Sequence, residues 1–125
     1  IDAAISVVAS AGKVGLIGYC WGGSLSWRAA CQSKILSASV SYYGGDIPAL
    51  KDQTPFCKFL AHFGELDKGI PIEAVNQFKV AQPDVLTYTY PADHGFNCNH
   101  RSQYNKISSK IALNRTKKFL DSQLS

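Results

Sequence analysis

Four short apolar runs, separated by stretches with helical spacing, constrain the fold of this chain more than any other feature. We expect a strand in each run, at residues 13–19, 37–43, 56–63 and 84–90. Short apolar runs bounded by turn residues are typical of buried strands. Apolar residues three or four positions apart predict helices at 2–10, 22–32, 71–81 and 102–123. Strands that alternate with helices predict an α/β fold in one domain, with a mostly parallel sheet and flanking helices.

The apolar side chains of these elements are expected to form one core. Trp27 and Phe59 are interpreted as core residues, and Cys31 and Cys57 as packed thiols that behave as small hydrophobes. His62 lies inside an expected strand and is interpreted as structural. The last helix is expected to turn five side chains towards the core: Tyr104, Ile107, Ile111, Leu113 and Phe119.

Three residues with catalytic chemistry follow expected strands. Cys20 comes after the first strand, Asp67 after the third and His94 after the fourth. Ligand sites of open α/β sheets lie beyond the carboxyl ends of the strands, so these side chains are expected to share one edge. Each alone has a structural interpretation, as a packed thiol, a turn residue or a loop histidine. Together they follow the order nucleophile, acid, histidine of the α/β-hydrolases, which favours catalysis.

The stretch GYCWGG, residues 18–23, places the thiol in a tight turn between a strand and a helix. Such a turn brings the backbones of Gly18 and Gly22 together and leaves no room for a side chain. It holds Cys20 in a strained, exposed position at the N-terminus of the next helix. The free N–H groups there favour a thiolate and a developing oxyanion.

Composition and charge argue against several other classes of protein. The net charge of +4 comes from scattered Lys and Arg residues, which does not indicate nucleic-acid binding. No apolar run approaches the ~20 residues of a membrane helix, and no signal peptide is recognised at the start. A zinc site at His94, Cys98 and His100 would lack a fourth ligand and a common spacing, so no metal is expected. The four cysteines form no C-x-x-C pair, and we expect reduced thiols in a cytoplasmic protein.

Four stretches of the chain carry a more specific signal, namely GLIGYCWGG, YYGG, HFGELDKGIP and HGFNCNHR. They resemble the dienelactone hydrolase family (carboxymethylenebutenolidases), in register over essentially the whole chain. The resemblance implies an α/β-hydrolase fold and hydrolysis of a lactone or carboxylic ester through a thioester acyl-enzyme. It implies Cys20 as the nucleophile, Asp67 as the acid and His94 as the base. No metal or organic cofactor is implied.

The resemblance also implies residues that bind the substrate. The N–H of Trp21 is expected to donate to the oxyanion, and Tyr42 to line the substrate pocket. The preferred substrate of the family is a small molecule that carries a carboxylate, and Arg101 is our candidate for its cationic partner. A surface arginine at a helix start is the alternative interpretation. Other members place an arginine four residues after the histidine, where this sequence has Cys98.

The family domain has several strands before the nucleophile strand, and one of them leads to the second oxyanion donor. We therefore expect residues 1–125 to be a partial domain whose N-terminal strands are missing. The leading hypothesis is a hydrolase of small-molecule esters or lactones. The alternatives are an incomplete, non-catalytic fragment or partner-binding module of the same fold and, less favoured, a relative of serine peptidases.

Overall fold

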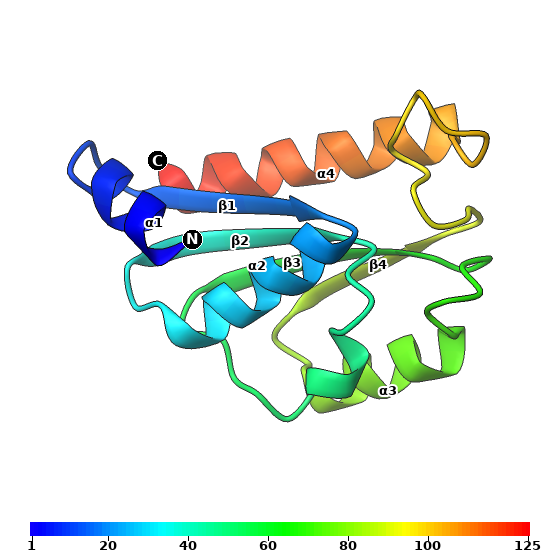
Figure 1. Ribbon diagram of the computed structural model, residues 1–125, viewed down its shortest axis with the longest axis horizontal. Coiled ribbons are helices and arrows are strands. Elements are labelled where there is room, and N and C mark those ends of the chain that lie inside the picture. The colour runs from blue at the N-terminus through cyan, green and yellow to red at the C-terminus, as the bar shows by residue number, and fades with distance from the viewer.

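Four parallel strands form the centre of the protein (Figure 1). The computed structural model describes all 125 residues and places the strands in the order β1-β2-β3-β4. Their bounds are β1 Val14–Tyr19, β2 Leu36–Tyr42, β3 Lys58–Gly64 and β4 Leu86–Tyr90. Each strand pairs in parallel with the next one along the chain. The predicted parallel α/β sheet is therefore confirmed, with strand ends that differ from the prediction by a few residues.

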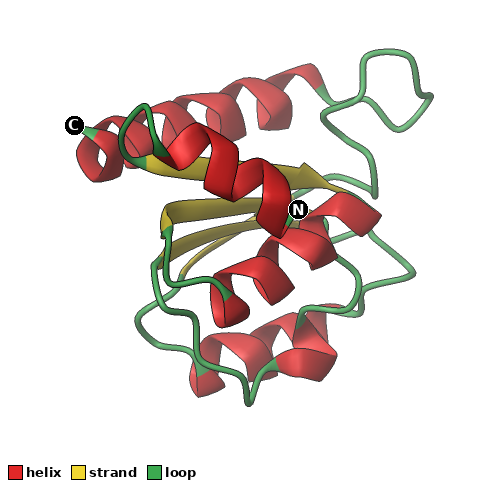
Figure 2. Ribbon diagram, turned by 60° about the vertical axis from the view of Figure 1, so that its left-hand side comes forward, coloured by secondary structure: helices red, strands yellow, loops and turns green.

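Helices cover both faces of this sheet (Figure 2). Their bounds are α1 Asp2–Ala9, α2 Trp21–Gln32, the 3₁₀ turn η1 Pro48–Leu50, α3 Ile72–Ala81 and α4 Lys106–Leu124. Helices α2 and α3 lie on one face and α4 lies on the other, along β1, β2 and β3. Asn105 caps α4 by accepting a hydrogen bond from the N–H of Ser108. No helix combines the length and the apolar composition of a membrane span.

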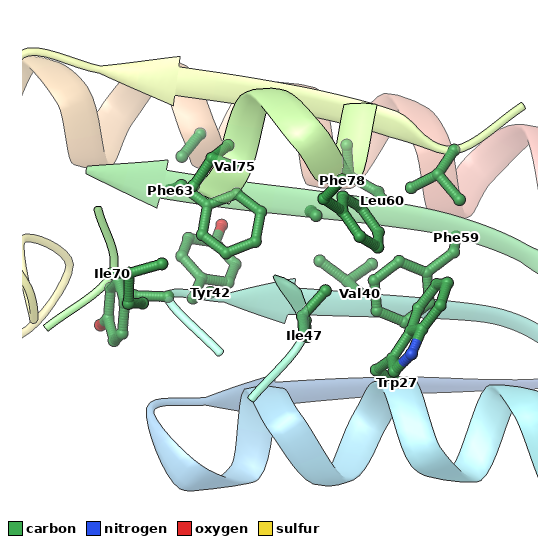
Figure 3. Packing of buried hydrophobic residues seen from close by; sticks show 14 of the residues in the cluster. Trp27, Val40, Tyr42, Ile47, Phe59, Leu60, Phe63, Ile70, Val75 and Phe78 are labelled. Carbon is green, nitrogen blue, oxygen red and sulfur yellow. The ribbon is translucent and has the colours of Figure 1, made fainter. Parts of the chain in front are cut away.

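The larger core packs the sheet against α2 and α3 on one face and against Ala112 and Phe119 of α4 on the other, and Figure 3 shows part of it. The Trp27 ring of α2 meets Phe59 of β3 edge-on at 4.9 Å and Phe78 of α3 at 5.2 Å, measured between ring centroids. Its indole N–H donates to the carbonyl of Leu50, so the only polar atom of this side chain is satisfied. Trp27 and Phe59 are therefore core residues, as predicted.

The core-facing side of α4 differs from the prediction. Four residues of this helix are buried, namely Ser108, Ala112, Thr116 and Phe119. Of the five side chains expected in the core, only Phe119 is buried there. The other four are exposed, namely Tyr104, Ile107, Ile111 and Leu113. The small and hydroxylated residues face the sheet because the Thr116 hydroxyl forms hydrogen bonds with His62 and Tyr42 of the sheet beneath the helix.

Candidate active site

Cys20 occupies the turn that joins β1 to α2. Its backbone has φ 55° and ψ −123°, a conformation that L-residues rarely adopt and that costs energy unless the surroundings impose it. The Cys20 N–H donates to the carbonyl of Tyr42 at 3.0 Å, and the Cys20 carbonyl accepts from the N–H of Gly23 at 2.9 Å. These hydrogen bonds tie the turn to the end of β2 and hold it in place.

The glycines of this turn have unequal roles. A Cβ on Gly18 would lie 1.9 Å from the carbonyl oxygen of Gly22, so only glycine fits there. A Cβ on Gly22 itself would meet nothing within 4 Å, and the expectation that Gly22 leaves no room for a side chain is wrong. The second restricted position is Gly23, where a Cβ would lie 2.7 Å from the carbonyl oxygen of Tyr42 and 3.1 Å from Gly44. Sequence reasoning missed this contact, although the paired glycines at 22–23 and 44–45 were a signal for it.

Asp67 and His94 form a hydrogen-bonded pair. Nδ1 of His94 lies 2.6 Å from Oδ2 of Asp67, whose side chain is only 3% exposed. The other oxygen, Oδ1, accepts from the N–H of Gly69 at 2.9 Å. A buried carboxylate with both oxygens engaged can fix the orientation of the imidazole, while the Nε2 side of the ring is left for chemistry.

The loops that carry this pair are fastened to each other. Backbone N–H groups of Glu65 and Leu66 donate to the carbonyls of Tyr90 and Ala92. Gly64 permits this approach, because a Cβ there would lie 2.3 Å from the Ala92 oxygen. The loop after β3 and the loop after β4 therefore meet beyond neighbouring strand ends, as the sequence predicts.

Cys20 lies near this pair without a hydrogen bond to it. No hydrogen bond joins its thiol to His94, but Asp67 and Arg101 are both close enough to shift the pKa of that thiol. Burial has the largest effect and raises the pKa, the positive charge of Arg101 lowers it, and Cys98 and Asp67 raise it further. The net result is a raised pKa, whereas the helix N-terminus had led us to expect a favoured thiolate. A thiol with a raised pKa would need a base to take its proton before it could act as a nucleophile.

Tyr42 and Tyr43 are both buried in the core but have different neighbours. The hydroxyl of Tyr42, which was expected to line the substrate pocket, lies 2.9 Å from Oγ1 of Thr116. Tyr43 is the first residue after β2 and has φ 42°. Its ring centroid lies 4.9 Å from that of His94. The Cys20 thiol is also close enough to raise the pKa of Tyr43, although burial is the larger cause.

The two other residues expected in the site are Trp21, at the start of α2, and Arg101, beside Gly95. Trp21 is 73% exposed and is the first residue of α2, so its N–H has no partner within the helix. The Arg101 side chain lies over Gly95, where a Cβ would be 2.7 Å from Nη1. Gly95 has φ 77° and directly follows His94. Arg101 forms no ion pair with a carboxylate, and its charge acts on the Cys20 thiol.

Cys31, Cys57 and His62 have structural surroundings. All four cysteines are free, and Cys31 and Cys57 pack against the core, where burial raises the pKa of each to about 11. His62 is fully buried, with Nδ1 on the Tyr90 hydroxyl and Nε2 on Thr116. The protein has no cluster of three or more His, Cys, Asp or Glu side chains that could bind a metal ion.

Comparison with known sequences gives a consistent result. Residues 1–124 match the dienelactone hydrolase family. A carboxymethylenebutenolidase from Pseudomonas putida is 31% identical over 117 residues, which are 89% of this chain and 49% of that protein. Proposed carboxymethylenebutenolidases from Methylorubrum extorquens and Synechocystis are 30% and 32% identical, over 83% and 90% of this chain and 43% and 51% of those proteins. The chain therefore spans about half the length of the curated relatives it matches.

Solved structures with the same arrangement include a proposed dienelactone hydrolase from Klebsiella pneumoniae. It superposes with a TM-score of 0.80 at 28% identity, over 92% of this chain and 56% of that one. An esterase from Pyrococcus furiosus gives a TM-score of 0.78 at 13% identity, over 99% of this chain and 60% of that one, and shows likeness of fold alone. The four parallel strands and their helices are thus part of an α/β-hydrolase fold.

Proposed function

This chain belongs to the dienelactone hydrolase family, and from that premise we propose that it contributes the catalytic triad of a carboxylic ester or lactone hydrolase. The observation that carries the proposal is the hydrogen-bonded pair of buried Asp67 and partly exposed His94, which lies beyond the carboxyl ends of the strands, where Cys20 occupies a strained turn. In this proposal Cys20 is the nucleophile, His94 the base and Asp67 the group that orients His94.

Attack begins with the neutral thiol that the raised pKa of Cys20 favours. Nε2 of His94 takes the thiol proton as the sulfur bonds to the substrate carbonyl carbon, and the C=O electron pair moves onto oxygen. The N–H of Trp21 donates to this oxyanion at the start of α2, where the helix dipole also favours negative charge. Asp67 stabilises the imidazolium that forms.

Collapse of this intermediate breaks the C–O bond of the ester. The leaving oxygen takes the proton from His94 and departs as an alcohol, or stays attached when the substrate is a lactone. Cys20 is left as a thioester. His94 then accepts a proton from water as the water oxygen attacks the thioester, and it returns that proton to the departing sulfur. The products are a carboxylic acid and the free thiol, so no external oxidant or cofactor enters the balance.

For the substrate we propose a small ester or lactone with a carboxylate of its own. The support for this is Arg101, which lies over Gly95 beside His94 and has no carboxylate partner in the protein. A guanidinium in that place can pair with a substrate carboxylate by charge-assisted hydrogen bonds.

The test is hydrolysis of p-nitrophenyl acetate by the full-length protein that contains this chain. Cys20→Ala is expected to lower kcat/KM by about 1,000-fold or more and His94→Ala by about 100-fold or more, with little further loss in the double variant. Cys31→Ala, which removes a thiol in the last turn of α2, is the matched control. Mass spectrometry of the quenched reaction should find one acetyl group on Cys20. An acetyl group on another residue, or a Cys20→Ala protein of undiminished activity, would disprove the triad.

A second candidate function is a non-catalytic module of the same fold. The observation in its favour is that β1, which carries the nucleophile, pairs on one side only, with β2. Comparing kcat/KM of residues 1–125 with that of the full-length protein separates the two functions. If residues 1–125 fold but show no activity while the full-length protein is active, the isolated chain is a non-catalytic module.

A further inference from the structure

A cleft opens between the edge strand β4 and the second half of α4. Its volume is about 410 Å³, within the roughly 300–1,000 Å³ of small-molecule sites. The cleft is lined near the first residues of β3 and β4, whereas Cys20, Asp67 and His94 lie beyond the carboxyl ends of the strands. It is therefore separate from the proposed catalytic site.

The floor of this cleft is formed by apolar residues of β3 and β4, which α4, packed along β1, β2 and β3, leaves partly uncovered. Leu60 and Leu86 are neighbours in the register of β3 and β4, and both line the cleft with Tyr88. Leu86 is 48% exposed, an unusual degree for a leucine in a sheet. Phe119 of α4 closes the opposite wall.

Cations dominate the charged groups around this apolar floor. Arg115, Lys58 and Lys118 line the cleft, and Asp84 is the only acidic residue among the lining residues. Arg115 is half-buried, with its guanidinium carbon 4.0 Å from the ring centroid of Tyr88. Neither of the two ion pairs in the protein includes Arg115, so this charge has no carboxylate partner.

The position of Arg115 is fixed by a buried network. Its Nη1 donates to the Tyr90 hydroxyl at 3.2 Å, and that hydroxyl lies 2.8 Å from Nδ1 of His62. Nε2 of His62 lies 2.9 Å from Oγ1 of Thr116. Because arginine can only donate, the Tyr90 proton is free to reach His62. One of the five guanidinium N–H groups is used in this way, and the fork is left with donors for a ligand.

We propose that this cleft binds a small amphipathic carboxylate. Its apolar body lies on Leu60, Leu86 and Phe119, and its carboxylate pairs with Arg115, with support from Lys58 and Lys118 at the rim. Charge complementarity selects this class, since a neutral apolar ligand would leave the half-buried Arg115 unpaired and further desolvated. The site does not depend on Cys20 and goes beyond the proposed hydrolysis.

The test is titration of the ¹⁵N-labelled full-length protein that contains this chain with 4-phenylbutyrate and, in parallel, with the uncharged 4-phenylbutan-1-ol, with amide chemical shifts as the readout. Saturable shifts are expected at Tyr88, Arg115 and Phe119 for the acid. Binding of the alcohol should be weaker by about tenfold or more, which corresponds to about 1.4 kcal/mol. Arg115→Gln is expected to weaken binding of the acid by a similar factor, and Lys110→Gln, an exposed change elsewhere on α4, should leave it unchanged.

Leu86→Glu provides a second variant in case Arg115→Gln disturbs the buried network. It adds a carboxylate to an exposed edge position of the cleft and should abolish saturable binding in a protein with native amide shifts elsewhere. Equal binding of acid and alcohol, shifts centred on His94, or full binding by Leu86→Glu would each overturn the proposal. A further titration uses anionic lipid vesicles. Amide shifts that appear only with these vesicles and do not saturate would also overturn the proposal, because the residues of the cleft would then contact a membrane surface and not a small ligand.

Discussion

Gly18 and Gly22 stand four residues apart in the nucleophile turn, yet alanine should affect them in opposite ways. At Gly18 a Cβ would lie 1.9 Å from the Gly22 oxygen, and backbone must move. Overpacking of this kind costs about 1–3 kcal/mol or more. At Gly22 there is open space, and alanine in the first turn of α2 should be neutral or stabilise by up to about 1 kcal/mol.

Urea unfolding of the two single variants, Gly18→Ala and Gly22→Ala, measures this difference directly. Each is the control for the other, because the added group is one methyl in both. Similar free energies of unfolding for the two variants would contradict the tight turn described for Cys20.

The sequence predicted that Cys20, Asp67 and His94 each follow a strand, and they follow β1, β3 and β4, while their catalytic roles stay predictions. Strand β2 ends at Tyr42, so Tyr43 is the residue beyond its carboxyl end. Tyr42 was chosen through the resemblance to the family and not from its position, and the expected strand, 37–43, included Tyr43. Both tyrosines are buried in the core, and Tyr43, the residue beyond the strand end, is the one whose ring lies beside His94.

At the scale of elements, the strands and helices were predicted well and the buried face of α4 was not. Apolar residues at 107, 111 and 113 suggested one face, but the helix buries Ser108 and Thr116. A pattern of apolar residues cannot reveal that the sheet beneath offers hydrogen-bonding partners. Here the partners are His62 of β3 and Tyr42 of β2, and both meet Thr116.

This contact between α4 and the sheet should make stability depend on pH. Burial, followed by the charge of Arg115, lowers the pKa of His62 from 6.5 to about 3. Between these values the unfolded chain binds a proton that the folded chain does not. The contribution of His62 to the free energy of unfolding is therefore fully present above pH 6.5 and is lost as the pH falls towards 3. The loss amounts to up to about 1.4 kcal/mol per pH unit.

Chemical unfolding of wild type, His62→Gln and His100→Gln across this range tests the assignment. His62→Gln should be less stable than wild type at neutral pH, by about 1–3 kcal/mol for the damaged network. It should also lose less stability on acidification. His100 is exposed, so His100→Gln should follow wild type. If the His62→Gln and wild-type curves ran parallel, His62 would not be the titrating group.

At the scale of the molecule, an apolar surface extends from the free edge of β1 to α4. Gly15 of β1 faces Leu120 and Leu124 of α4. Because side chains alternate along a strand, Ile17 and Tyr19 point to that same face, where they are 40% and 45% exposed. The sequence predicted this unpaired edge through the resemblance, since the family places further strands before the nucleophile strand.

Residues 1–125 alone should therefore associate with themselves. An edge strand offers unpaired N–H and C=O groups to a second copy, and apolar side chains beside it add to the attraction. Ile17→Lys should oppose this pairing, because a charge on an edge strand must stay hydrated. Sedimentation velocity over a range of concentrations should show dimers or larger species for the wild-type chain. Ile17→Lys should raise the concentration at which these species form by about tenfold or more, which corresponds to about 1.4 kcal/mol of association free energy. Val80→Lys is the matched control, since Val80 is 83% exposed on α3, away from β1, and should not alter association. A wild-type chain that stays monomeric at every concentration, or equal effects of the two lysines, would show that the β1 edge does not drive association.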